Sequence, residues 1–568
     1  MRDATRHWSS SPDPSTSPAA LAAEPTRDLV VGVDVGTGSA RAGVFDLHGT
    51  MLGTDSHPIQ IFRPAPDHAE HSSDDIWSAV ALAVRGAIAR ADIDPGRVAG
   101  ISFDATCSLV ALGEGDTPIT VSTTGDPAHN VIVWMDHRAE TEAHHINRTG
   151  HRVLDFVGGR ISPEQEPPKL LWLKLNLPDT WQSARKLLDL ADFLVYRASG
   201  RDVRSLCTLV CKWTYLGHEG EHGEWDPTFF EQVGLADLFD HGRAGEIVRP
   251  MGTGVGALTE RAAAELGLPR DTVVGVGIID AHAGGIGAVG MRGAGERFDP
   301  VAIERTLSLI GGTSSCHMAV SREPRFIPGV WGPYYGAMIP GYWLTEGGQS
   351  ATGALIDHVI ENHAYAPALR DDATRQGTTV YELLNRRVRE LVARNAGRPI
   401  AEHLHVFPDF LGNRSPRADS QLRGMISGLG LDSSLDSLAA LYLATIRAVA
   451  YGTRHIIEAL EAKGYVLDRV HATGGGTKNP LWLREHADIT GRAIYVAPDV
   501  DAVLLGTAML AAVAAGAYSS IPAAIAAMSP SATSIEPDPS SQVFHEAKYA
   551  VFHRMYNDQQ AYRLMMGG

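Results

Sequence analysis

LVVGVDVGTGSARAGVF, residues 29–45, is the stretch that decides the expected fold. Its Val-rich first half favours a strand, and Gly36, Thr37, Gly38 and Ser39 then interrupt the pattern before a second run of small and apolar residues. We therefore predict two strands joined by a tight glycine turn. In such a turn successive backbone N–H groups lie open and form a concavity that binds anions. The turn is a candidate phosphate site.

A second stretch repeats this construction. LSLIGGTSSCHMAV, residues 307–320, also has a short apolar strand, a turn of Gly, Thr and Ser, and a second apolar strand. One hairpin at the head of each half of the chain indicates duplicated domains. We place these domains at residues 28–295 and 296–560, with a connector between them over residues 287–304.

Segments with helical and strand periodicity alternate between and after the two hairpins. This alternation predicts an α/β fold. Helices are expected over Ser73–Arg90, Lys169–Leu175, Leu435–Lys463 and Asp501–Ala515, and strands over Val98–Phe103 and Val470–Thr473.

The composition narrows the class of protein. The 568 residues are 44% apolar and carry a net charge of −17, with no long run of like charge. Nucleic acids and anionic membranes attract cationic proteins, so we expect neither as a partner. Residues 1–27 are rich in Ser, Thr, Pro and Ala and predict a disordered leader. The apolar stretch Ala502–Ala517 is too short to cross a membrane, and we expect it to be a buried helix.

The cysteine content points to a reducing compartment. The chain has four cysteines, too few for a disulfide scaffold, which favours a cytoplasmic location. Cys207 and Cys211 form a C-x-x-x-C pair, but no second pair follows at the spacing of a zinc site. We therefore expect buried small side chains at these positions rather than metal ligands.

Asp34 precedes the first glycine turn on a strand otherwise built from Val and Gly. Burying a carboxylate without a partner is costly, and Mg²⁺ often binds one carboxylate together with nucleotide oxygens. Asp34 is therefore a candidate magnesium ligand. The alternative is that Asp34 caps its own hairpin turn.

Asp280 ends an apolar strand in VVGVGIIDAHAGG, residues 273–285, and small residues follow it. These residues leave room for a ligand. A carboxylate here can accept the proton of a substrate hydroxyl that attacks phosphorus. The alternative is a helix N-cap, because Asp favours that position.

A run of three glycines lies in HATGGGTKNP, residues 471–480, between a predicted strand and a helix over residues 481–489. Bare glycine backbone lets a flat ring or a phosphate lie directly on the chain. No G-x-x-x-x-G-K-[ST] motif occurs, so an ATP site here is not of the Walker type. A plain strand-to-helix turn is the alternative.

Polar residues with small or aromatic neighbours, as in carbohydrate pockets, occur at scattered positions. They are Asp104 in SFDATCS, Asp136 in VWMDHR, Lys212 in CKW and Glu346 in TEGGQS. Each is a candidate sugar ligand, although a structural ion pair or cap is the commoner role for any one of them.

A series of motifs makes the chain resemble the FGGY carbohydrate kinases over residues 28–560, and they occur in the order found in that family. They are DVGTGSARAGVFD, SFDATCSLVAL, VWMDHR, KLLWLK, IIDAHAGG, GGTSSCH, EGGQS, FLGNRSP, GGGTKNPLW and GTAMLAA. DATCSLV, LVCKWTY, GTSSCHM and GVWGPY are similar to the ribulokinase-like subgroup.

The resemblance implies two duplicated actin-like, ribonuclease-H-like ATPase domains that bind ATP and a sugar in the cleft between them. It further implies that Asp34 lies beside Mg²⁺ and that Asp280 is the general base. The residues that it places at the nucleotide are Thr37, Gly38, Ser39, Arg41, Gly312, Thr313, Ser314, Gly474, Gly475, Gly476 and Asn479.

The resemblance also implies a sugar site. Lys212, Asp280 and Glu346 align with sugar-contacting positions of ribulokinases, and Asp104 and Asp136 complete the expected set together with Cys107. The position of Cys107 holds Ala or Gly in relatives that use L-ribulose, which implies contact with the sugar.

The expected reaction is ATP-dependent phosphorylation of a ketopentose, D-ribulose to D-ribulose 5-phosphate. One alternative is another pentulose or a pentitol, such as L-ribulose, xylulose or ribitol. The other is an actin- or chaperone-like ATPase that acts on no sugar. We also consider a homodimer.

Overall fold

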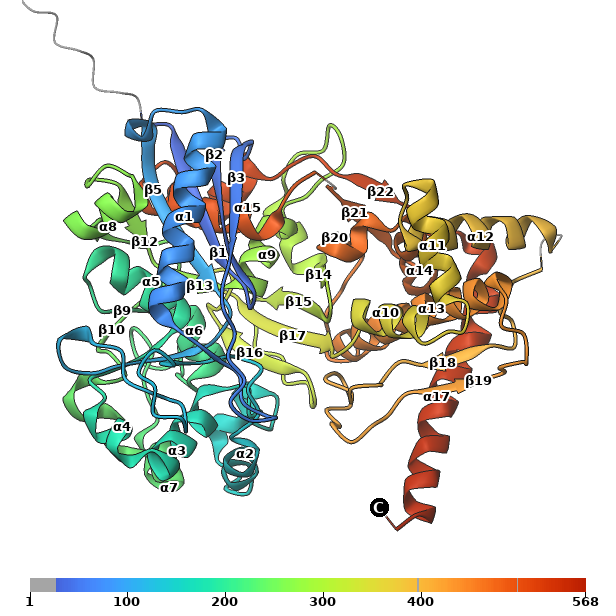
Figure 1. Cartoon of the computed structure of the whole chain (residues 1–568), viewed down its shortest axis with the longest axis horizontal. Helices are drawn as coiled ribbons and strands as arrows, with labels where there is room; N and C mark the ends of the chain where they lie inside the picture. Colours follow the sequence, from blue (N-terminus) through green and yellow to red (C-terminus); the bar gives the residue numbers. More distant parts are fainter. Residues whose placement is uncertain (1–26, 396–397, 498, 568) are drawn as a thin grey trace, which may run out of the picture.

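The computed structural model describes residues 27–395, 398–497 and 499–567, which form two lobes (Figure 1). Each lobe is built on one large mixed sheet. The predicted leader, residues 1–27, lies outside the described residues except for Arg27, whose guanidinium lies 2.5 Å from the carboxylate of Asp271.

The first sheet has seven strands and contains the first glycine hairpin. β1 (Leu29–Val35) is antiparallel to β2 (Ser39–Asp46) and parallel to β5 (Val98–Ala105). Alternate residues of a strand face opposite sides, and every residue of β1 is buried because helices cover both faces. The other strands are β3 (Met51–Pro58), β11 (Gly254–Ala257), β12 (Val273–Gly275) and β13 (Ile278–Ile279).

The second sheet, also of seven strands, contains the second hairpin. β14 (Thr306–Gly311) is antiparallel to β15 (Ser315–Ser321) and parallel to β20 (Arg469–Thr473). The other strands are β16 (Trp331–Tyr335), β17 (Trp343–Gln349), β21 (Ala493–Val496) and β22 (Thr533–Ile535).

The two sheets share one topology. In the first, the order β3-β2-β1-β5-β12-β11 has two antiparallel pairs, two parallel pairs and a final antiparallel pair. The order β17-β15-β14-β20-β21-β22 in the second follows the same sequence of directions. The predicted α/β fold with a duplicated hairpin is confirmed.

Two helices connect the halves of the chain through their packing. α15 (Ala502–Ala514) comes from the second half of the chain but packs on β1 and β5 of the first sheet, where its red ribbon lies beside blue strands in Figure 1. α9 (Asp280–Val289) packs against both α15 and β14. A Cβ on Gly287 would lie 1.9 Å from the carbonyl oxygen of Ala502, so only glycine allows these helices to touch. A division of the chain at residue 295 therefore does not separate the elements that pack on the first sheet from those that pack on the second, because α15 follows residue 295 but packs on the first sheet.

The expected helices are present, with ends that differ by a few residues. They are α1 (Ser73–Ala91), α3 (Glu166–Asn176), α13 (Leu435–Glu461) and α15, and the predicted buried helix over Ala502–Ala517 is confirmed. The predicted connector is wrong at its start, because α9 continues through Val289.

The remaining elements surround the two sheets. A four-stranded sheet consists of β4 (Glu70–His71), β7 (Val131–Ile132), β6 (Leu109–Leu112) and β8 (Lys186–Asp189), and two pairs consist of β9 (Val203–Ser205) with β10 (Ile247–Arg249) and β18 (His405–Phe407) with β19 (Met425–Ser427). The other helices are α2 (Glu140–Asn147), α4 (Pro178–Ser183), α5 (Leu190–Ser199), α6 (Leu206–Lys212), α7 (Pro227–Val233), α8 (Glu260–Leu266), α10 (Gly353–Glu361), α11 (Ala366–Gln376), α12 (Val380–Arg394), α14 (Pro480–Thr490), α16 (Ile521–Met528) and α17 (Gln542–Met565). Among the described residues, no helix has the length and apolar character needed to span a membrane.

Candidate active site

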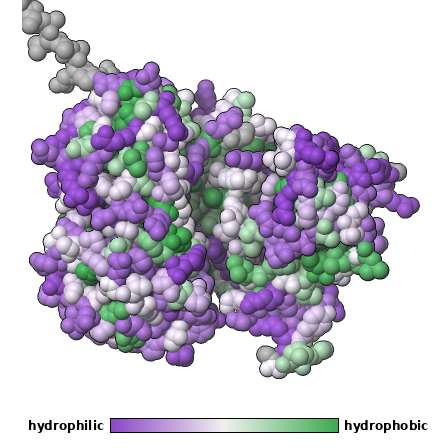
Figure 2. Space-filling view, in the orientation of Figure 1, coloured by the Kyte–Doolittle hydropathy of each residue, from purple (hydrophilic) through white to green (hydrophobic). Residues whose placement is uncertain are grey.

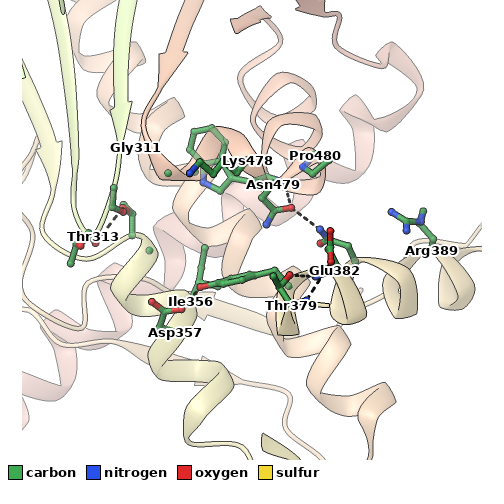
Figure 3. Close-up of a pocket in the computed structure, with 18 residues that line it drawn as sticks. Gly311, Thr313, Ile356, Asp357, Thr379, Glu382, Arg389, Lys478, Asn479 and Pro480 are labelled. Carbon is green, nitrogen blue, oxygen red and sulfur yellow. Dashed lines mark hydrogen bonds between the residues drawn. The ribbon is translucent and has the colours of Figure 1, made fainter. Parts of the chain in front are cut away.

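Two cavities lie beside the glycine hairpins. The small cavity, of about 350 Å³, lies between the lobes, where the surface is hollowed in Figure 2. Both halves of the chain line it, with Asp34, Lys212 and Asp280 from the first and Cys316 and Glu346 from the second. The large cavity, of about 880 Å³, lies within the second half, and its lining residues are drawn in Figure 3.

The turn of the second hairpin lies between the two cavities. Gly311, Gly312 and Thr313 line the large cavity, whereas Ser314 lines the small one. A group bound across this turn would reach from one cavity into the other. Because successive backbone N–H groups of such a turn bind anions, the turn suits a phosphate chain that connects the two cavities.

Asp34 lines the small cavity at the end of β1. Arg41, on the facing strand, donates from Nε to Asp34 Oδ2 at 2.8 Å, and its Nη1 lies 2.5 Å from Asp501 Oδ2. Burial raises the pKa of Asp34, although the charge of Arg41 opposes the shift. Asp34 therefore bonds across the hairpin and does not cap its own turn.

Thr37, Gly38, Ser39 and Arg41, all predicted at the nucleotide, line the small cavity. The hydroxyl of Thr37 accepts a hydrogen bond of 2.9 Å from Trp134 Nε1. The first turn thus faces the small cavity beside Asp34.

Asp104 is predicted as a sugar ligand, but the structure places it behind the cavity wall. It pairs in register with Asp34 on the neighbouring parallel strand, is fully buried, and accepts a hydrogen bond from the Thr507 hydroxyl of α15. Burial and the charge of Asp34 raise the pKa of Asp104 well above its usual value. Residues farther along the same segment, Thr106 and Cys107, line the cavity instead.

Asp136 is likewise outside the small cavity. Arg138 donates to both of its carboxylate oxygens, at 2.8 and 2.7 Å, and the backbone N–H of Ala69 donates at 2.6 Å. This buried ion pair uses the hydrogen-bonding capacity that a sugar would need. The prediction that Asp136 contacts the sugar is therefore corrected to a structural role.

Asp280 lines the small cavity from the first residue of α9. The N-cap position belongs to Ile279, and Asp280 Oδ1 accepts a hydrogen bond from the next backbone N–H, that of Ala281, at 2.6 Å. Burial, followed by the charge of Asp34, raises the pKa of Asp280 to about 6. A carboxylate with this pKa is ionised at neutral pH yet accepts a proton more readily than an ordinary aspartate.

Three further predicted sugar ligands meet Asp280 in the small cavity: Cys107, Lys212 and Glu346. Burial raises the pKa of the Cys107 thiol to about 12, so this group is neutral. Burial opposes the charge of Lys212, but the carboxylates of Glu346 and Glu164 help to raise its pKa well above the usual value. The cavity thus offers a cation, carboxylates and a neutral thiol within one small volume.

Residues that sequence reasoning missed complete the small cavity. The indole of Trp331 lies between two cations, 5.0 Å from Lys212 Nζ and 5.2 Å from the guanidinium carbon of Arg414. Glu164 also lines the cavity, and its pKa falls to about 2 because Arg414 and His137 outweigh the effect of burial. Arg414 lies in the FLGNRSP motif, which was a usable signal.

The large cavity contains the predicted glycine loop. Gly475 and Gly476 line it, whereas Gly474 shapes the turn with a φ of 88°. A Cβ on Gly474 would lie 2.5 Å from the carbonyl oxygen of Gly311, so glycine is required where the loop meets the second hairpin. The glycine loop therefore connects β20 to α14 and also forms part of the wall of the large cavity, so the two alternatives for this segment do not exclude each other.

Asn479 lines the large cavity, but its side chain serves the protein (Figure 3). Its Oδ1 accepts hydrogen bonds from Asn385 at 3.0 Å and from the backbone of Leu481 at 3.1 Å, and its Nδ2 donates to Tyr442 at 2.7 Å. Asn479 thus caps α14 and fixes the wall of the cavity. Tyr381, on α12, also lines this wall and was not predicted.

Comparison with known proteins identifies the family of the chain. The N-terminal domain of the FGGY family of carbohydrate kinases matches residues 29–287, and the C-terminal domain of that family matches residues 307–515. The chain belongs to the FGGY family of carbohydrate kinases. Members use ATP, so the large cavity and the glycine turns are the expected nucleotide side, and the small cavity is the expected sugar side.

Named relatives cover most of the chain. An FGGY carbohydrate kinase domain-containing protein from Xenopus laevis is 46% identical over 94% of this chain and 98% of its own length. A D-ribulokinase from Saccharomyces cerevisiae is 39% identical over 86% of this chain and 72% of its own length. A ribulokinase from Geobacillus thermodenitrificans is 31% identical, over 86% of each chain.

Solved structures share the fold. A xylulose kinase from Rhodospirillum rubrum superposes with a TM-score of 0.74 at 22% identity, over 94% of this chain and 99% of that one. A glycerol kinase from Plasmodium falciparum, solved with ADP, has a TM-score of 0.72 at 15% identity, over 94% and 98% of the two chains.

Proposed function

We propose that this FGGY kinase transfers the γ-phosphoryl group of ATP to the terminal hydroxyl of a ketopentose, with D-ribulose as the preferred acceptor and D-ribulose 5-phosphate as the product. The observation that carries the proposal is the convergence of Asp280, Lys212 and Glu346 in one small cavity beside the first glycine turn. The 39% identity to a D-ribulokinase supports the choice of sugar.

Asp280 is the proposed general base. The sugar hydroxyl attacks the γ-phosphorus, its O–H bond breaks, and the proton moves to the carboxylate, whose pKa of about 6 suits the task at neutral pH. The bond between the γ-phosphorus and the β–γ bridging oxygen breaks, and ADP leaves with that oxygen. The transition state of phosphoryl transfer is loose, so alignment and charge stabilisation supply most of the acceleration. In this proposal the backbone N–H groups of the two glycine turns hold the phosphates.

The residues around the first turn fit a divalent cation. Burial and the charge of Asp34 raise the pKa of both Asp104 and Asp280, and Arg41 is paired with Asp34. Carboxylates beside a phosphate turn suit Mg²⁺; Asp34 and Asp280 both line the cavity, and Asp34 is the one beside the turn. Mg²⁺ bound there would neutralise charge on the transferring phosphates.

Sugar choice rests on Cys107, Lys212 and Glu346. Pentuloses that are epimers differ only in the direction of a hydroxyl, so the wrong epimer leaves a buried polar group unpaired, at a cost of about 1–3 kcal/mol per group. That range corresponds to a preference of roughly 5- to 150-fold in kcat/KM. We therefore expect a measurable preference rather than absolute discrimination.

The test is a comparison of kcat/KM for D-ribulose, L-ribulose, D-xylulose, ribitol and glycerol at one saturating ATP concentration. We expect D-ribulose to have the highest value. A rival acceptor that exceeds D-ribulose by more than about tenfold would overturn the sugar assignment and leave the kinase assignment intact. The cytoplasmic location and the homodimer stay predictions.

A further inference from the structure

A chain of buried hydrogen bonds connects the wall of the small cavity, which His282 and Glu346 line, to Cys207 behind that wall, and neither Cys207 nor His282 has a part in the proposed mechanism. Cys207 Sγ, on α6, lies 3.0 Å from His282 Nδ1, on α9, and His282 Nε2 lies 3.1 Å from Glu346 Oε2, on β17. The three side chains are 0%, 1% and 7% exposed, so water does not compete for these bonds.

The chain joins both halves of the molecule. α6 ends at Lys212, α9 begins at Asp280, and β17 belongs to the second sheet. Glu346 is therefore held by His282, which lies two residues after the proposed base on α9, although Glu346 itself reaches the sugar cavity from the opposite lobe.

The proton positions follow from the chemistry of the partners. An ionised carboxylate only accepts, so His282 must donate from Nε2 to Glu346. Its Nδ1 then either accepts from the Cys207 thiol or donates to the thiolate, and in both cases Cys207 fixes the ring orientation and the proton on Nε2. Cys211, one turn farther along α6, lies 4.0 Å from the same nitrogen and is the more distant sulfur.

The electrostatic surroundings favour a charged pair. The pKa of Cys207 falls to about 5 because neighbouring hydrogen bonds and His282 outweigh the effect of burial, and the pKa of His282 rises to about 10 because Cys207 and Glu346 outweigh it. Burial opposes the charge of Glu346, but His282, Lys212 and Arg414 lower its pKa. An imidazolium between a thiolate and a carboxylate keeps Glu346 ionised.

We propose that Cys207 and His282 are positioning residues of the sugar site. Through the imidazole of His282, Cys207 holds the Glu346 carboxylate in the orientation in which it accepts a hydrogen bond from a hydroxyl of the sugar. This inference rests on the proposed function only in that the small cavity receives a sugar. Cys207 and His282 are buried and, in the proposed mechanism, contact neither ATP nor the phosphoryl group.

The first experiment compares Cys207→Ala with Cys211→Ala, a matched control that removes a thiol of equal size and similar burial from the same helix. An interaction with Glu346 that is equal in the ground and transition states affects KM rather than kcat. We expect Cys207→Ala to raise the sugar KM about tenfold, with kcat and the ATP affinity changed less than about threefold. Cys207→Ser, which can still donate to Nδ1, should restore part of the loss.

A double-mutant cycle tests whether Cys207 acts through His282. The amide of His282→Gln can donate to Glu346 without help from a thiol, so Cys207→Ala should cost nothing further in that background. The ultraviolet absorbance of a thiolate should be present in the wild type and absent from Cys207→Ala. Melting temperatures of all variants show whether each is folded.

Three outcomes would overturn the inference. The first is a sugar KM in Cys207→Ala equal to that of Cys211→Ala, and the second is an unchanged cost of Cys207→Ala in the His282→Gln background. The third concerns metal: the two sulfurs and His282 Nδ1 lie within 4.8 Å of one another, three donors among the described residues where a structural zinc site needs four. Stoichiometric zinc in the purified protein would show that Nδ1 binds metal.

Failure of this inference differs from failure of the proposed function. The KM comparison uses whichever sugar the wild type phosphorylates best, so a preference for xylulose would overturn the D-ribulose assignment and leave this test valid. The thiolate absorbance and the metal analysis need no turnover at all.

Discussion

The two glycine hairpins have the same backbone but different chemistry. Two residues before the first turn, Asp34 of β1 faces Asp104 of β5. At the matching positions of the second sheet, Ile310 faces Thr473. One copy of the duplicated sheet therefore has a pair of carboxyl side chains near its turn, and the other has an apolar and a neutral polar residue.

This difference separates the two halves by task. Carboxylates beside a phosphate turn suit a cation and proton transfer, and the small cavity lies there. A neutral turn beside bare glycine suits a bound nucleotide, and the large cavity lies there. Under the proposed function, the same turn therefore occurs in both halves, and the residues near it make the first copy the reactive side.

Removal of the proposed base should have the largest effect on turnover and should leave ATP binding by the second half unchanged. We expect Asp280→Asn to lower kcat at least about 100-fold, because the amide cannot accept the hydroxyl proton. Calorimetry should show an unchanged affinity for ATP. Near-normal turnover by a folded variant would remove Asp280 from the mechanism.

Two matched glycine variants should separate the halves. A Cβ at Gly38 or at Gly475 meets no protein atom within 4 Å, so Val at either position projects into open space. We expect Gly475→Val to weaken ADP binding at least about tenfold and to leave sugar binding unchanged. Gly38→Val should instead lower kcat and change ADP affinity less than about threefold. The reverse pattern would exchange the roles of the two cavities.

The pH dependence of kcat/KM should show the titration of Asp280 in the first half. Asp280 has its pKa raised to about 6, so it is protonated below that pH and cannot act as a base. At saturating ATP we expect kcat/KM for the sugar to be level above pH 6 and to fall about tenfold per unit below it. The residual activity of Asp280→Asn should lack this acidic limb. A wild-type profile that stays level down to the range of an ordinary aspartate would contradict the account.

Asp104→Asn should have the smallest effect. Burial and the charge of Asp34 raise the pKa of Asp104 well above its usual value and so favour its neutral form, which an amide of the same shape resembles. We expect the sugar KM and kcat to change less than about threefold. A large rise in the sugar KM would restore the sequence-based assignment of Asp104 as a sugar ligand.

The sequence was most informative where backbone conformation limits the choice of residue. The loop at Gly474 requires a residue without a side chain, because a Cβ there would lie 2.5 Å from the carbonyl oxygen of Gly311, and its run of glycines was visible before the structure. Asp280 was visible because an acid at the end of an apolar strand is costly without a task.

The sequence was least informative about which buried acids are already paired. Asp104 and Asp280 both follow apolar strands, and only the position of Thr507 on α15 shows that Asp104 lies behind the wall. Arg138, two residues after Asp136, was the available sign of a structural ion pair. Trp331 reaches the small cavity through long-range packing that local periodicity does not encode.

The central claim is that both cavities serve one reaction, in which ATP is consumed only when a sugar receives its phosphate. The most direct test measures ADP and sugar phosphate together, with saturating ATP, in the presence and absence of D-ribulose. The account predicts equal amounts of ADP and pentulose phosphate with the sugar, and almost no ADP without it. Release of ADP at the same rate whether or not the sugar is present would contradict the account and favour an ATPase that acts on no sugar.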